Sequence, residues 1–185
     1  MIRLYARAAA VTSVTFLAVS AGAQTLDSLP QRRAGQWEMQ TVTEKPAGAP
    51  VITTRICVDA ATDHELMEFG LRTSKEVCSQ HEVKRAGKSW VIDAQCTFGP
   101  MTSTTHTVVT GDFQSAVTLH IESKTTGLHG RADKFKETLM TQTSRWTGPC
   151  KDGMVPGDIS MANGLKINVR QLKGLQKLLP KIQIR

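Results

Sequence analysis

The stretch CSQHEVKRAGKSWVIDAQC, residues 78–96, places two cysteines at equal distances from a central glycine. If the chain turns about Ala86-Gly87-Lys88, residues whose numbers add to 174 face each other, and Cys78 lies opposite Cys96. Directly opposed residues of an antiparallel pair have Cα atoms about 4.5 to 5.5 Å apart, a separation that a disulfide accepts. We therefore expect a β-hairpin closed by a disulfide. A two-residue turn would make the two cysteines diagonal neighbours instead.

The same register predicts other facing pairs in this hairpin. They are Lys84 with Trp90, Val83 with Val91, and His81 with Asp93, the last as a cross-strand charge pair.

The two remaining cysteines, Cys57 and Cys150, are left to pair with each other. A thioredoxin-like redox site needs two cysteines separated by two residues, and structural zinc is usually held by closely spaced pairs. Successive cysteines here lie 21, 18 and 54 positions apart, so the spacing favours two disulfides over either alternative.

The first 23 residues have the pattern of a cleavable export signal. Arg3 and Arg7 precede the apolar run AAAVTSVTFLAVS, and Ala21-Gly22-Ala23 has the small-x-small form of a cleavage site. The apolar run is shorter than the roughly 20 residues that a membrane-spanning helix needs. We expect cleavage after Ala23 and a periplasmic location, where cysteines form disulfides. The alternative is a buried N-terminal helix.

Residues 24–150 are predicted to form one antiparallel β-domain. Threonine and other β-branched residues gather in short runs separated by Gly, Pro, Asp or Lys, with no long helical pattern between them. The expected fold class is mainly β, a meander that forms a curled sheet or a partly closed barrel. The predicted strands are Gly35–Thr43, Val51–Val58, Ser79–Lys84, Ser89–Thr97, Thr102–Thr110, Ser115–Thr125 and Lys134–Trp146.

One short helix is predicted in TDHELMEFG, residues 62–70. Thr62 and Glu65 have the spacing of a capping box, and Gly70 suits the residue after a helix end. HELME at His64 resembles the start of a zinc-protease helix, but residue 68, where the second histidine would stand, is a glutamate. This segment therefore does not predict a metal site.

Residues 151–185 are predicted to form a basic amphipathic tail. This segment has seven Lys and Arg against two Asp and Glu, whereas residues 24–150 are balanced. A helical spacing would place Leu172, Leu175 and Leu179 opposite Lys173 and Lys177, a pattern that binds an anionic membrane surface or a partner's groove. Alternatively, the leucines pack on the body of the same chain.

Two histidines give a weak candidate site. If Asp112-Phe113-Gln114 is a turn, His106 and His120 face each other on the polar side of a hairpin. Opposed imidazoles can bind a divalent metal or act as a pH switch, but solvated histidines are the preferred interpretation. No catalytic residue, cofactor or metal is predicted, and basic residues without aromatic neighbours argue against nucleic acid.

The ordered set Gly35-Gln36-Trp37-Glu38, Cys57, Cys78 with Cys96, and Gly148-Pro149-Cys150 resembles the bacterial exported family known as domain of unknown function 3617. The resemblance spans about residues 30 to 150. It implies a small envelope β-domain, with no established activity or catalytic residues. Trp37 is expected to cap the core, with a role in ligand binding as the alternative.

The function expected from these features is a non-enzymatic module at the cell envelope that binds an apolar small molecule or a protein partner. A curled sheet can enclose a small apolar pocket. Two alternatives stay open: a structural envelope protein, and a hydrolase or isomerase whose site residues are dispersed along the strands.

Overall fold

The computed structural model describes residues 29–128 and 134–171, and for residues 70–76 the backbone only. The predicted export signal, residues 1–23, and the leucine-rich end of the tail, which includes Leu172, Lys173, Leu175, Lys177 and Leu179, lie outside the described residues. Within the described part, no helix is long and apolar enough to span a membrane.

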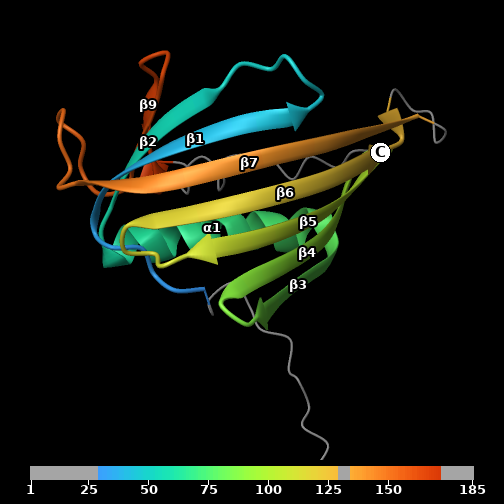
Figure 1. Cartoon of the computed structure of the whole chain (residues 1–185), viewed down its shortest axis with the longest axis horizontal. Coiled ribbons are helices and arrows are strands. Elements are labelled where there is room, and N and C mark those ends of the chain that lie inside the picture. Colours follow the sequence, from blue (N-terminus) through green and yellow to red (C-terminus); the bar gives the residue numbers. More distant parts are fainter. Residues whose placement is uncertain (1–28, 129–133, 172–185) are drawn as a thin grey trace, which may run out of the picture.

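The chain forms one antiparallel sheet of nine strands in the order β3-β4-β5-β6-β7-β1-β2-β8-β9, and the sheet is not closed (Figure 1). The mainly β fold class and all seven predicted strands are confirmed. The strands are β1 Gly35–Lys45, β2 Ile52–Val58, β3 Cys78–Ala86, β4 Ser89–Phe98, β5 Met101–Gly111, β6 Ala116–Thr126, β7 Phe135–Gly148, β8 Asp158–Met161 and β9 Lys166–Asn168.

Helix α1, Ala60–Val77, joins β2 to β3, which lie six positions apart in the sheet, and covers one face. Figure 1 shows it behind β5 and β6. The predicted capping box is wrong by three residues. The backbone N–H of Thr62 donates to Asp59 Oδ1 (2.7 Å), and that of Asp59 donates to Thr62 Oγ1 (2.9 Å), so Asp59 is the cap. The predicted end at Gly70 is also wrong, because the helix continues for another seven residues.

The core lies on the face of the sheet that α1 covers, which we call the inner face. Alternate residues of each strand point to it, as the pleat requires. Trp37 of β1 is fully buried there. The buried core cluster consists of Trp37, Ile56, Val58, Val83, Trp90, Val109, Phe113 and Val117.

The β3–β4 hairpin confirms the predicted pairing of Cys78 with Cys96 but corrects the register between them. The turn has two residues, Gly87 and Lys88, and Gly87 has the positive φ of 62° that such turns favour. A bulge between Cys78 and Gln80 restores the opposition of the two cysteines. The other predicted pairs are wrong by one residue: Lys84 faces Val91, Val83 faces Ile92, and His81 faces Ala94.

Both predicted disulfides, Cys57–Cys150 and Cys78–Cys96, are present. They join residues 93 and 18 positions apart. Cys57 precedes α1 by three residues and Cys78 follows it directly, so a disulfide joins the chain at each end of the helix to a distant segment, which is Cys150 just after β7 in one case and Cys96 of β4 in the other. Two disulfides indicate a protein that folds in an oxidising, exported location.

The sheet continues beyond Cys150, where the tail was expected to begin. β8 pairs with β2, and β9 pairs with β8. The backbone N–H of Gly157 donates to Cys57 O (2.8 Å), and that of Val169, a fully buried residue, donates to Gly157 O (2.9 Å). Residues 151–171 therefore belong to the same sheet and core as the strands before them.

Candidate functional site

A small cavity of about 190 Å³ lies between α1 and the inner face of the sheet. Apolar side chains form most of its wall because the inner-face residues of β4, β5 and β6 are large and aliphatic near the start of α1. The chief apolar residues are Met39, Met67, Ile92, Val109, Val117 and Leu119. Leu29 and Pro30, which precede β1, also line it.

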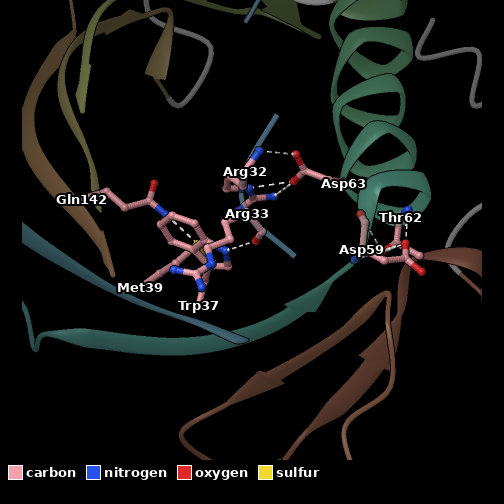
Figure 2. A network of polar contacts seen from close by, with 8 residues as sticks. All are labelled: Arg32, Arg33, Trp37, Met39, Asp59, Thr62, Asp63 and Gln142. Carbon is pink, nitrogen blue, oxygen red and sulfur yellow. Dashed lines mark hydrogen bonds and ion pairs between the residues drawn. The ribbon is translucent and has the colours of Figure 1, made fainter. Parts of the chain in front are cut away.

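One wall of the cavity carries a buried ion pair. Asp63 lies in the first turn of α1, and its side chain is 1 % exposed, while that of Arg32 is 17 % exposed. Arg32 donates to Asp63 through its backbone N–H (2.9 Å to Oδ2) and through Nε (2.7 Å to Oδ1), with Nη2 2.6 Å from Oδ1 (Figure 2). The positive end of the helix macrodipole also favours a carboxylate in this turn. The two opposite charges therefore offset each other, and both oxygens of the carboxylate have a hydrogen-bond donor.

Residues 29–34, which we call the strap, are held against the sheet by further contacts. Arg33 donates its backbone N–H to Phe113 O (2.8 Å) and accepts at its carbonyl from Trp37 Nε1 (2.8 Å). Its guanidinium lies 3.6 Å from the ring centroid of Trp146, a cation–π contact. Trp146 Nε1 donates to Ala34 O (3.0 Å). The strap thus packs against the sheet and closes one side of the cavity.

Two polar side chains of β7 complete the wall. Gln142 donates from Nε2 to the thioether sulfur of Met39 (3.4 Å), and Figure 2 shows both side chains on the sheet side of the strap. Ser144, 4 % exposed, also lines the cavity. Because the two residues are separated by one position along a strand, they share the inner face. The cavity therefore combines an apolar body with a few convergent polar groups, which is typical of small-molecule sites.

Hydrogen bonds favour the charged form of the carboxylate that caps α1. The pKa of Asp59 lies below its usual range, chiefly because the Thr62 backbone N–H and then the Thr62 hydroxyl donate to it. The hydrogen bonds between Asp59 and Thr62 fix the start of α1 and with it the position of Asp63, which lies one turn further along the helix.

The predicted opposition of His106 and His120 is wrong. The β5–β6 turn is displaced by one residue, so His106 faces Glu122 and His120 faces Val108. The two histidines share the outer face as diagonal neighbours with different partners: His106 Nδ1 lies 2.6 Å from Asp93 Oδ1, and His120 Nδ1 lies 3.1 Å from Thr141 Oγ1. Among the described residues, no group of three or more His, Cys, Asp or Glu side chains is close enough to bind a metal.

Two larger hollows, of about 490 and 460 Å³, lie beside His106 on the outer face. Their walls are mainly charged and hydroxyl side chains, and the side chains of His106 and Asp93 are 49 % and 45 % exposed. The inner cavity is smaller, but its predominantly apolar wall makes it the stronger candidate for binding a small molecule.

The sequence did not indicate this site. Trp37, a weak ligand candidate, lies in the core and is not among the residues that line the cavity. Arg32 and Asp63 are 31 residues apart and come together only through the path of the strap, so their spacing carries no signal. Gln142 and Ser144 alternate with Thr141, Thr143 and Arg145, which are also polar, so no contrast in polarity marks the inward side of β7 here.

A family model described as a protein of unknown function (DUF3617) matches residues 32–150. No curated protein and no solved structure matches the chain. The matched region begins at Arg32 and ends at Cys150, so it contains the ion-paired arginine, α1 and both disulfides but not β8 and β9.

Proposed function

Since the chain belongs to the DUF3617 family of proteins of unknown function, we propose from its geometry that it is a non-enzymatic binding module for a small apolar molecule. The observation that carries the proposal is the cavity of about 190 Å³ between α1 and the sheet. An apolar cavity of about 150 Å³ is large enough to bind benzene. The proposed ligand, or the part of it that is enclosed, is therefore about the size of one ring.

The proposed place of this function is the periplasm, after cleavage behind Ala23. The charged and apolar pattern of residues 1–23 supports export, and the two disulfides support an oxidising compartment. In such a compartment the disulfides at both ends of α1 would hold this helix, which covers the cavity, in place against the sheet.

Two alternatives have less support. An enzymatic role has one geometric argument, the Asp93–His106 pair, in which a carboxylate orients an imidazole as in general-base sites. That pair lies half exposed on the outer face, where charged groups commonly meet. A purely structural role would favour a filled interior, which the cavity argues against.

Methionine methyl groups test the proposal directly. Met39 and Met67 line the cavity, whereas Met154 and Met161 lie elsewhere. In ¹³C-methyl-labelled protein, we expect toluene to shift the Met39 and Met67 signals in a saturable manner and to leave Met154 and Met161 unchanged. Uniform small shifts of all four signals would contradict a defined site.

A pair of variants separates binding in the cavity from binding elsewhere. Leu119→Phe fills the cavity from β6, and we expect it to weaken the toluene response about tenfold or more. Leu139→Phe adds the same ring on β7, where Leu139 is 36 % exposed, and should leave the response unchanged. An equal response in both variants would place toluene outside the cavity.

A further inference from the structure

The cavity contains hydrogen-bonding groups whose capacity is largely unused. The amide nitrogen of Gln142 donates to a thioether sulfur, which is a weak acceptor. The hydroxyl of Ser144 makes no hydrogen bond with any described residue. Every completely inaccessible side-chain nitrogen or oxygen among the described residues has a partner, so this hydroxyl keeps access to open space. A ligand can therefore gain hydrogen bonds here without displacing strong ones.

The cavity has no unpaired charge in its described wall to receive an ionised group. Arg32 is the cation that lines it, and Asp63 already neutralises this cation through three short contacts. A carboxylate ligand would approach a buried carboxylate, and an ammonium ligand would approach a buried guanidinium. Transferring either ion from water into such a site is costly unless a new partner compensates for the lost solvation.

We propose that the ligand of this cavity is a neutral molecule with a body of about one ring and a single hydroxyl or carbonyl group, bound through Gln142 and Ser144. A ligand hydroxyl can donate to the amide oxygen of Gln142 and accept from the hydroxyl of Ser144. This inference rests on the proposed binding function and adds the chemical class of the ligand.

The first part of the test compares four molecules of nearly equal size: toluene, benzyl alcohol, benzoate and benzylamine. Each is titrated into the full mature chain, and binding is followed at the Met39 and Met67 methyl signals. We expect toluene and benzyl alcohol to bind and the two ions to bind at least about tenfold more weakly than benzyl alcohol.

The second part uses variants that remove the hydrogen-bonding groups. Gln142→Leu and Ser144→Ala should each weaken binding of benzyl alcohol about tenfold and leave binding of toluene unchanged or stronger, because only the alcohol uses these groups. Gln40→Leu, a matched change at an exposed position of β1, should affect neither ligand. Thermal unfolding of each variant checks that the fold is kept. If one of the two β7 variants does not fold, the other still tests the inference.

The possible failures are distinguishable. If toluene binds and the β7 variants weaken both ligands equally, the neutral-polar class is wrong while the proposed function stands. If benzoate binds more tightly than benzyl alcohol, Arg32 is an anion site and the inference is likewise overturned. If none of the four molecules shifts the Met39 and Met67 signals, the proposed function itself fails.

Discussion

At the connection between β5 and β6, the carboxylate of Asp112 accepts hydrogen bonds from the backbone N–H groups of Gln114, Ser115 and Ala116. Between them stands Phe113, a core residue with an unusual positive φ of 59°. The side chain of Asp112 organises the turn and so sets the register of the two strands. The sequence could indicate that a turn occurs here, but not that the carboxylate would stabilise a longer one.

Asp112 predicts a pH dependence. Its pKa lies well below the usual range because the backbone N–H of Ser115, then the Ser115 hydroxyl, then the N–H groups of Ala116 and Gln114 donate to the charged form. A depressed pKa in the folded state adds stability above the unfolded pKa of about 3.9, and this stability is lost as the pH falls. We expect Asp112→Ala to lower the melting temperature at pH 7 and to reduce the further loss between pH 5 and pH 2 relative to the original chain.

The control for this prediction is Gln114→Ala, which removes an uncharged side chain from the same turn and keeps its backbone N–H. Its melting temperature should follow the same pH profile as that of the original chain. Identical profiles for Asp112→Ala and the original chain would show that the hydrogen bonds of this carboxylate do not stabilise the fold.

Among the elements, the strands were predictable and the details of their pairing were not. Short runs of β-branched residues divided by Gly, Pro, Asp or Lys predicted seven of the strands correctly, but β8 and β9 are only four and three residues long and carry too little pattern. The length of α1 was underestimated because Gly70 suits a helix end, and only the following segment decides whether the helix continues. The cavity depends on contacts among α1, the strap and the sheet, none of which is local in sequence.

The two disulfides predict unequal losses of stability. In the chain-entropy model, closing a loop of 93 residues is worth about 4.7 kcal/mol and a loop of 18 residues about 3 kcal/mol, both as upper figures. We expect the paired change Cys57→Ala with Cys150→Ala to lower the free energy of unfolding more than Cys78→Ala with Cys96→Ala. Denaturant unfolding measures both, and a reversed order would contradict the model for this chain.

For the whole molecule, the position of β8 and β9 changes how the tail should be tested. A chain that ends at Cys150 loses two strands and the buried Val169 together with the leucine-rich segment. Any loss of membrane binding in such a chain could then result from a damaged fold. A chain that ends at Gln171 keeps every described strand and removes only residues 172–185.

We expect the chain of residues 24–171 to keep the melting temperature of the chain of residues 24–185 within a few degrees, and the chain ending at Cys150 to be clearly less stable. If the basic leucine-rich segment binds membranes, liposomes with anionic lipid will retain the chain of residues 24–185 but not the chain ending at Gln171. Equal retention of these two forms would remove the membrane role. A large loss of stability at Gln171 would instead mean that the segment packs on the body.

The disulfides at both ends of α1 bear on how the proposed ligand would be exchanged. Because the helix is tethered before its first turn and after its last, it is poorly suited to swing away from the sheet. The strap is held by hydrogen bonds, an ion pair and one stacked guanidinium, all of which can break and reform on ordinary timescales. Of the two elements that cover the cavity, the strap is therefore the one that non-covalent contacts alone hold in place, and under the proposed function we expect ligand exchange to depend on residues 29–34 more than on α1.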